Sequence, residues 1–507
     1  MTFETDVALP MAVRSFVTEL ESREHAIKAT LLLRVGDETC YRLAVRPDAC
    51  TVLSGDGPAD VRVQVAQEAD LTPLLRGSMP VGAQPPLGPL AVEGDTGLLH
   101  DLIRERMLGA NPDLVSLDLP DPLTCLDGTP VRDAAAWRTH RRSEILALLE
   151  AQLYGRAPGP PAALRCELLE SDDGALGGTA RRRQVRLIVE NMGKALPIEL
   201  LVYLPREASG PVPMFLGLNF GGNHTVQPDP AIRVTQQWIR DKTGGGRHTA
   251  GEDQRGSAAS RWPVERILAR GYGLATLYCG DLDPDYHDGF QNGVHPLFYR
   301  PGQTRPDPDQ WGAIGAWAWG LSRVLDYFQA DAACDAEHVA VMGHSRLGKT
   351  ALWAGAQDER FALVISNCSG CCGASLERRG FGETLELLNR VFPHWCCANA
   401  RDWHERSAAR PFDQHMLLAL IAPRPLYVAS AFEDTWADPR GEFLSALAAS
   451  AVYERLGVEA LPADAMPTPG EAVMGGIGYH ARPGGHDVTA YDWDQYMMFA
   501  DRHWGRR

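Results

Sequence analysis

The sequence lacks the features that mark membrane-spanning, exported and nucleic-acid-binding proteins. No apolar run reaches the length of a membrane-spanning helix, and the first residues show no basic start followed by an apolar core. Acidic residues outnumber basic ones, 65 against 49, and the densest basic run, residues 181–183, is short. Such a composition disfavours nucleic acid and anionic membranes as partners. We therefore expect a cytoplasmic protein without a membrane span or a nucleic-acid partner.

Cysteine motifs with metal-ligand spacing are also missing, although the chain has 11 cysteines. Cys368, Cys371 and Cys372 are followed by Cys396 and Cys397, but no second CxxC pair completes a zinc knuckle. Because cytoplasmic cysteines stay reduced, the pattern favours buried thiols over a disulfide framework. The sequence predicts no metal and no organic cofactor.

The chain has 507 residues, which is too long for one ordinary hydrophobic core, and its pattern of apolar and polar residues changes near residue 112. Residues 1–112 predict a small α+β domain. Strand character predicts three strands, ATLLLRV (29–35), CYRLAV (40–45) and VRVQV (61–65). Helical spacing of apolar residues predicts helices over 12–30, 68–77 and 98–108. A linker rich in Pro, Asp and Gly leads into the larger part, residues 113–507.

The order of elements in residues 1–112 resembles the sterol-carrier-protein-2-like domains, in which a curved antiparallel sheet and helices enclose an apolar groove. The landmarks are Gly36, Asp70, Leu74, Leu75, Gly77 and VEGD (92–95). The resemblance implies an apolar ligand. One alternative is an unrelated small α+β domain. Another is that the groove is filled by the side chains of the domain itself or by a second subunit, and the sequence does not determine the oligomeric state.

Short apolar runs alternate with helical segments in residues 113–507. Five runs are of the kind buried on both faces of a parallel sheet: 212–220, 272–279, 338–344, 363–370 and 425–431. Residues 182–191 and 198–205 predict an antiparallel pair. The alternation predicts an α/β fold with a doubly wound, mostly parallel sheet, of the α/β-hydrolase type.

One of these runs ends in a turn that suits a catalytic serine. In VAVMGHSRLGK (339–349), Gly343 and Gly348 permit a close approach of strand and helix. Ser345 stands at the helix start, where backbone N–H groups favour developing negative charge. The match to G-x-S-x-G is imperfect, because Leu347 occupies the place of the last glycine. A serine that only caps the helix is the alternative.

Two further sites complete the chain order serine, acid, histidine. His486 lies in the glycine-rich segment ARPGGHDVT (481–489), outside any apolar periodic run. Glu433 and Asp434 follow the run that ends at residue 431, where an acid can orient the histidine and stabilise its imidazolium. With Ser345, these residues predict a serine hydrolase.

Residues from about 120 to 507 resemble carbohydrate esterase family 15, the glucuronoyl esterases. GHSRLGK (343–349) fits that family's G-x-S-R-x-G-K turn, and FLGLNFGGNH, CSGCCGASLERRGFGET, WADPRGEF and PGGHDVT fit bacterial members. The resemblance implies Ser345 as nucleophile, His486 as general base and Arg346 as a donor to the oxyanion.

The same resemblance implies that Lys349, Glu383 and Trp436 bind the hydroxyls of a uronate sugar. A solvated helix lysine, a surface acid and a packing tryptophan are the respective alternatives. The chain departs from the family at Cys368, where many members carry the triad acid, and a thiol cannot orient an imidazolium as a carboxylate does. We expect Asp434 to serve, and we favour it over Glu433 because it stands two residues before Trp436, as in bacterial relatives.

The sequence thus predicts a serine carboxylic ester hydrolase that cleaves a small uronate-type or lipophilic ester through an acyl-enzyme. Two alternatives stay open. A biosynthetic acyltransferase or cyclase would use the same triad with an alcohol as acceptor. A lipid-binding protein would retain the hydrolase fold as a non-catalytic relic.

Overall fold

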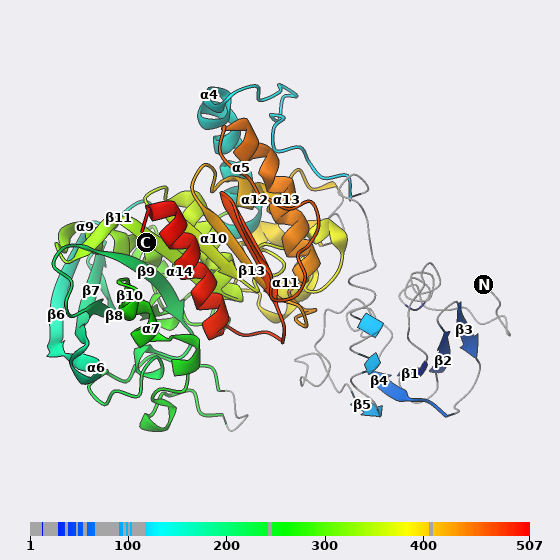
Figure 1. The fold of residues 1–507 in the computed structure, drawn as a ribbon, viewed down its shortest axis with the longest axis horizontal. Coiled ribbons are helices and arrows are strands. Elements are labelled where there is room, and N and C mark those ends of the chain that lie inside the picture. Colours follow the sequence, from blue (N-terminus) through cyan, green and yellow to red (C-terminus); the bar gives the residue numbers. More distant parts are fainter. Residues whose placement is uncertain are drawn as a thin grey trace.

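The computed structural model describes residues 117–506, apart from 242–245 and 405–408. Before residue 117 it describes a set of shorter pieces: 13, 29–35, 39–46, 49–53, 58–65, 91–94, 98–99 and 102–103. Within these residues a five-stranded sheet precedes a ten-stranded one (Figure 1). The described helices include none that combines the length and the apolar character needed to cross a bilayer.

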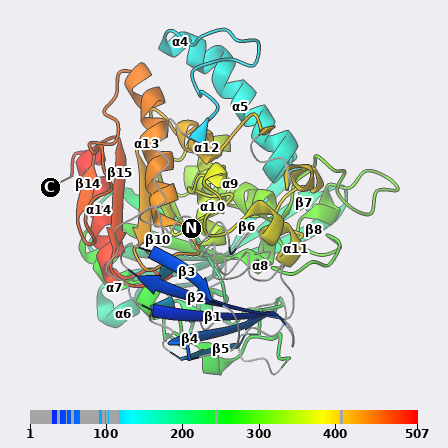
Figure 2. The same ribbon diagram turned by 90° about the vertical axis from the view of Figure 1, so that its right-hand side faces the viewer.

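The small sheet is built from five short strands: β1 Ala29–Val35, β2 Thr39–Arg46, β3 Ala49–Leu53, β4 Val61–Val65 and β5 Ala91–Gly94. Their order is β3-β2-β1-β4-β5, with β1 antiparallel to β2 and parallel to β4 (Figure 2). Leu31 is paired with Leu43 and Val61, and all three side chains are buried.

The bounds expected for β1 and β4 are confirmed, whereas β3 was not expected. The helices expected over 12–30, 68–77 and 98–108 lie wholly or mostly outside the described residues. The likeness of residues 1–112 to sterol-carrier-protein-2-like domains, their apolar ligand and the boundary at residue 112 stay predictions.

The large sheet has the order β14-β15-β13-β12-β11-β9-β10-β8-β7-β6. Its strands are β6 Ala163–Gly174, β7 Ala180–Asn191, β8 Lys194–Pro205, β9 Val212–Asn219, β10 Gly273–Tyr278, β11 Cys334–His344, β12 Leu363–Asn367, β13 Leu426–Ala431, β14 Ala472–Met474 and β15 Ile477–Arg482. The six strands from β15 to β10 are mutually parallel, and β7 and β8 form the expected antiparallel pair. Edge strand β6 was missed because none of its residues is buried, so that it lacks the apolar run of a central strand.

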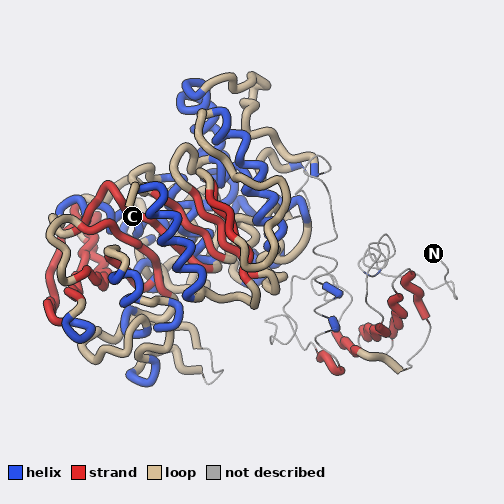
Figure 3. The backbone as a smooth tube through the Cα atoms, viewed as in Figure 1, coloured by secondary structure: helices blue, strands red, loops and turns tan. Residues whose placement is uncertain are grey.

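Helices cover both faces of this sheet (Figure 3). The described α-helices are α4 Ala134–Ala136, α5 Arg142–Leu149, α6 Ala175–Gly178, α7 Val264–Ala269, α8 Cys279–Leu282, α9 Ala313–Ala330, α10 Arg346–Gln357, α11 Leu385–Val391, α12 Gln414–Ala419, α13 Pro439–Arg455 and α14 Ala490–Trp504. Alternate residues of each central strand join separate cores, one with α9, α10, α12 and α13 and the other with α7 and α14. This confirms the doubly wound α/β fold and directs attention to the carboxyl ends of its central strands.

Candidate active site

Ser345 occupies a strained turn between β11 and α10. Its φ of 58° and ψ of −131° lie outside the regions that non-glycine residues favour. A Cβ at Gly343 would meet the carbonyl oxygen of Leu347 at 1.9 Å, so only glycine allows the strand and the helix to approach this closely. The Ser345 side chain makes no capping hydrogen bond to α10, and the helix-cap alternative is therefore wrong. The turn leaves the hydroxyl available for chemistry.

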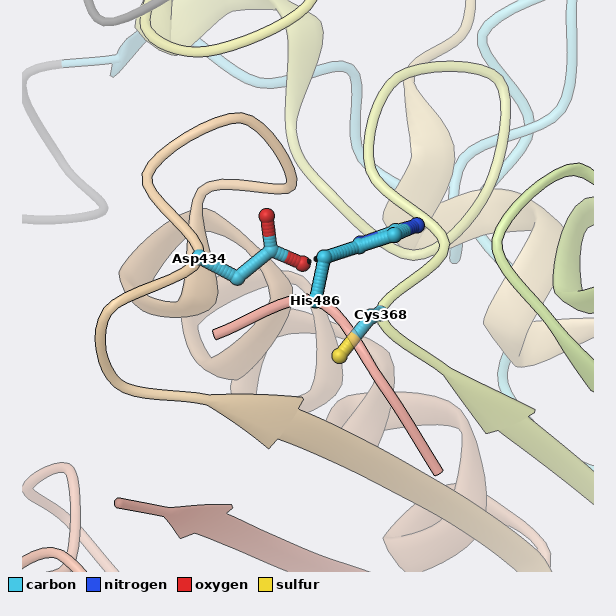
Figure 4. A group of neighbouring side chains, drawn as sticks. All are labelled: Cys368, Asp434 and His486. Atoms are coloured by element: carbon cyan, nitrogen blue, oxygen red, sulfur yellow. Dashed lines mark hydrogen bonds and ion pairs between the residues drawn. The ribbon is translucent and has the colours of Figure 1, made fainter. Parts of the chain in front are cut away.

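His486 and Asp434 form a short hydrogen-bonded pair at the ends of two neighbouring strands. His486 Nδ1 lies 2.6 Å from Asp434 Oδ2, and Figure 4 shows the far imidazole nitrogen directed away from the aspartate. Asp434 is buried, whereas 37% of the His486 side chain is exposed. Ser345 and His486 line the same cavity of 170 Å³. Since Asp434 holds Nδ1, Nε2 is the nitrogen left to exchange a proton with the serine.

The other two candidate acid positions have different roles. Cys368 Sγ lies within 4.8 Å of the Asp434 and His486 ligand atoms, but burial, with Asp434 adding to it, raises the pKa of this thiol well above its usual range. A neutral thiol gives an imidazolium no counter-charge. Glu433 is exposed, and its carboxylate accepts a hydrogen bond from the amide of Gly484 at 3.3 Å. Of the three side chains, only Asp434 holds the imidazole.

Arg346 is fixed at the rim of the same cavity. Its Nη2 lies 2.9 Å from Asp285 Oδ2, and its guanidinium stands 4.7 Å over the ring of Phe220. Asp285 also accepts a hydrogen bond from Trp395 Nε1 at 2.9 Å and contacts His394 Nε2 at 3.1 Å. Burial opposes the charge on Asp285, but Arg346 and His394 outweigh it and hold the pKa of this carboxyl well below its usual range. The Arg346 guanidinium therefore has a buried carboxylate partner, Asp285, that stays ionised.

Lys349, Glu383 and Trp436 form one compact unit along α10. Lys349 Nζ donates to the carbonyl oxygens of Ser369 (2.5 Å) and Cys371 (2.6 Å) and to Glu383 Oε2 (2.6 Å). Trp436 Nε1 donates to the other oxygen of Glu383. Lys349 and Glu383 are buried, so the alternatives of a solvated lysine and a surface acid are wrong. The structure brings the three together, but none of them lines the cavity beside the serine.

Three polar residues around the site were not anticipated from the sequence. Asp285 is the last residue of GDLDPD (280–285), and three acids within seven residues of the end of a buried parallel strand were the signal that could have found it. His344 Nδ1 lies 2.6 Å from Asn367 Oδ1, and the His344 ring stands 4.4 Å from that of His486. Burial lowers the pKa of His344 well below its usual range. It is therefore neutral and does not oppose a charge on His486.

Two clusters of the described residues have side chains of metal-ligand type. One is Cys368 with the Asp434–His486 pair, where Asp434 already engages the imidazole and the thiol is held neutral. The other is Cys371, Cys372 and Glu377, in which Glu377 is paired with the cation of Arg410. In each cluster, a side chain of metal-ligand type is thus already engaged in an ion pair or a hydrogen bond within the protein.

A serine on a strained strand–helix turn, with a histidine–aspartate pair across one cavity, defines a serine hydrolase of the α/β-hydrolase class. The family described as "Glucuronyl esterase, fungi" matches residues 305–457. "Carbohydrate esterase MZ0003" from an unknown prokaryotic organism is 51% identical over 390 residues, covering 76% of this chain and 89% of the relative. The chain belongs to carbohydrate esterase family 15, the glucuronoyl esterases, and is a serine carboxylic ester hydrolase.

Further relatives agree with this assignment. The solved structure of a glucuronoyl esterase from Solibacter usitatus is 49% identical, with a TM-score of 0.73 and coverage of 76% of this chain and 98% of its own. "4-O-methyl-glucuronoyl methylesterase 1" of Wolfiporia cocos is 34% identical over 358 residues, which are 67% of this chain and 72% of the relative. These relatives bear the names of esterases and support neither the acyltransferase nor the relic alternative.

Proposed function

We propose that this chain hydrolyses esters of a glucuronate-type uronic acid through an acyl-enzyme on Ser345. The observation that carries the proposal is that His486, held by Asp434 at 2.6 Å, lines one cavity together with Ser345 and Arg346. The names of relatives, glucuronoyl esterase and 4-O-methyl-glucuronoyl methylesterase, support a uronate as the acid half. The cytoplasmic location remains an expectation.

In the acylation half, Ser345 Oγ attacks the ester carbonyl while His486 Nε2 takes the hydroxyl proton. Asp434 keeps the imidazole in one orientation and stabilises its charged form. The first N–H groups of α10 have no partner within the helix, so they and the Arg346 guanidinium can donate to the oxyanion. When the carbon–oxygen bond breaks, the alcohol leaves with the proton from His486.

In the second half, His486 takes a proton from water, and the resulting hydroxide attacks the acyl-enzyme carbonyl. Collapse of that intermediate returns the proton from His486 to Ser345 and releases the uronic acid, which loses its own proton to solvent. A larger cavity of 520 Å³ adjoins the first and shares Phe220, Arg240, Arg261 and His344 with it. This volume supports an alcohol half larger than methanol.

Lys349, Glu383 and Trp436 are retained as the proposed sugar-binding residues on the strength of the family resemblance. In the present arrangement all three ammonium protons of Lys349 have acceptors. A sugar hydroxyl must therefore replace one of these hydrogen bonds or insert between Glu383 and Trp436. Burial raises the pKa of the Glu383 carboxyl, and the charge and hydrogen bond of Lys349 oppose the rise.

The test compares methyl and benzyl glucuronate with phenyl acetate and a long-chain phenyl ester, for the wild type and Ser345→Ala. We expect the highest kcat/KM of the wild type on benzyl glucuronate. Ser345→Ala should lose turnover of every ester while its unfolding midpoint stays unchanged, because the serine is not a packing position. Preference for the long-chain ester would reject the uronate substrate, and residual activity within tenfold would reject Ser345.

A further inference from the structure

His486 lies on a backbone segment whose sequence provides little rigidity. Gly484 has a φ of 90°, and Gly485 follows it directly before the histidine. Glycine has the most freedom of any residue, so holding two of them in one conformation has a large entropic cost. The bond to Asp434 orients the ring but does not fix the main chain that carries it. Something else must hold residues 483–487 in place.

Glu433 holds Gly484 through its amide, which donates to the Gly484 carbonyl oxygen at 3.1 Å, and the buried side chain of Arg482 makes the contacts on both sides of His486. Arg482 ends β15, four residues before His486, and is only 4% exposed. Its Nη1 donates to the carbonyl oxygen of Pro483 at 3.0 Å. Its Nη2 donates to the carbonyl oxygens of Gly485 at 2.9 Å and Asp487 at 2.6 Å. The last two carbonyls belong to the residues on either side of the histidine.

The guanidinium is itself held from behind by a buried carboxylate. Arg482 Nε donates to Asp492 Oδ2 at 2.9 Å, and Asp492 is fully buried in the first turn of α14. The same oxygen accepts from the amide of Thr489 at 2.7 Å, which fixes the helix start. Four of the five N–H bonds of the guanidinium are thus used in a planar fork that a lysine ammonium cannot reproduce.

We propose that Arg482 is a positioning residue of the esterase reaction, because its guanidinium holds the backbone on both sides of His486. It thereby fixes the imidazole relative to Ser345 without contacting the substrate. The proposal rests on the proposed role of His486 as general base, but not on the identity of the ester. A misplacement of about 1 Å can lower a rate by about 100-fold, so loosening this segment should reduce turnover strongly.

Arg424 provides a matched control for a merely structural arginine. It is half-buried and donates to three main-chain carbonyls, those of Gly355 (2.6 Å), Phe361 (2.9 Å) and Asp358 (3.2 Å). None of these residues lines the cavity of Ser345 and His486. Arg482→Lys and Arg424→Lys each disrupt bonds to three main-chain carbonyls, and only the Arg482 set borders the catalytic histidine; Arg482 has in addition its bond to Asp492.

The experiment measures kcat, KM and the unfolding midpoint of both variants with phenyl acetate and with methyl glucuronate. We expect Arg482→Lys to lower kcat about 100-fold on both esters with KM within about threefold. Arg424→Lys should keep kcat within about twofold despite a similar fall in midpoint. The second-order rate at which a fluorophosphonate labels Ser345 should fall with kcat in Arg482→Lys only, because this reagent also needs the histidine.

Equal kcat for the two variants, or a loss of activity that follows the midpoint in both, would overturn the proposal. If Arg482→Lys does not fold, Asp492→Asn offers a milder change that weakens the anchor of Arg482 but leaves every carbonyl in place. It should lower kcat about tenfold with KM unchanged, and an unchanged kcat would also reject the role. If the phenyl acetate results are as expected but the wild type does not turn over methyl glucuronate, the uronate substrate is rejected and the proposed role of Arg482 stands.

Discussion

Two aspartate–histidine pairs lie close together in this chain, and they differ in what surrounds them. His486 Nδ1 is 2.6 Å from Asp434 Oδ2, and His480 Nε2 is 2.9 Å from Asp492 Oδ1. His480 is completely buried, and its second nitrogen contacts the hydroxyl of Tyr427 at 2.9 Å. His486 is partly exposed, and its second nitrogen is free to serve the cavity beside the serine. An aspartate–histidine pair alone is therefore not sufficient for a general base. The histidine must also present its second ring nitrogen to the nucleophile.

The surroundings also set the charges of the buried pair. Burial lowers the pKa of His480, so this histidine is neutral and its role is to complete a hydrogen-bond network. Asp492 is saturated by His480, Arg482 and Thr489, and its partners outweigh burial and lower its pKa. The buried pair is therefore part of the scaffold that carries the exposed one. The same histidine-to-glutamine substitution should therefore have different effects in the two pairs, on turnover at His486 and on stability at His480.

The largest effect is expected from His486→Gln. Glutamine keeps a polar group of similar reach but cannot take the serine proton, so kcat/KM on benzyl glucuronate should fall by at least about 10⁴-fold. Thermal unfolding should change little, because the side chain is partly exposed and its ring packs only against that of His344 among the described aromatic contacts. A loss of less than about tenfold would show that another group is the base.

The next largest effect is expected from Asp434→Asn, with a loss of turnover of about 10⁴-fold, because an amide no longer stabilises the imidazolium. Glu433→Gln and Cys368→Ala are the matched controls for the two neighbouring positions, and both should stay within about threefold of the wild type. Steady-state kinetics of the three variants decide the acid. Comparable losses in Asp434→Asn and either control would mean that the assignment of Asp434 is wrong.

His480→Gln should produce the opposite pattern from His486→Gln. Loss of one partner in a buried network leaves polar atoms unpaired, so the free energy of unfolding should fall by about 2 kcal/mol. The kcat on benzyl glucuronate should remain within about threefold, since Arg482 and Asp492 are untouched. Urea unfolding followed by fluorescence measures the first quantity. A large loss of kcat at unchanged stability would remove the distinction between the two pairs.

The smallest effect concerns the pH dependence of stability. The folded pKa of His480 is lower than the unfolded value of about 6.5, so the unfolded chain binds the proton first as the pH falls. This residue therefore makes the wild type less stable as the pH drops from about 7 to 5. Asp492, whose pKa is also lowered, adds its loss only below about pH 4. Unfolding midpoints at pH 7, 6 and 5 should fall less steeply in His480→Gln, and equal slopes would contradict the assignment.

Much of the fold could be predicted because each central strand has its own local signal. The bounds of β1 and β4 follow from apolar and alternating runs, and the turn at Ser345 follows from glycines two residues before it and three residues after it. The edge strand β6 could not be found in this way, because an exposed strand does not need an apolar pattern. A buried charged residue such as Arg482, whose partners are a carboxylate and main-chain carbonyls of the following residues, gives no signal in a periodicity argument.

What the sequence alone determined is the class of chemistry: a serine after a buried strand, a later acid and a last histidine, with the family's G-x-S-R-x-G-K turn around the first. Only the tertiary structure decided which groups meet. It brought Asp434 rather than Glu433 to His486, joined Asp285 to Arg346, and buried Lys349 with Glu383. The physical reason is that residue type and spacing fix local backbone geometry. Hydrogen bonding and charge pairing between side chains depend instead on distances of a few ångströms, set by how the strands and helices pack.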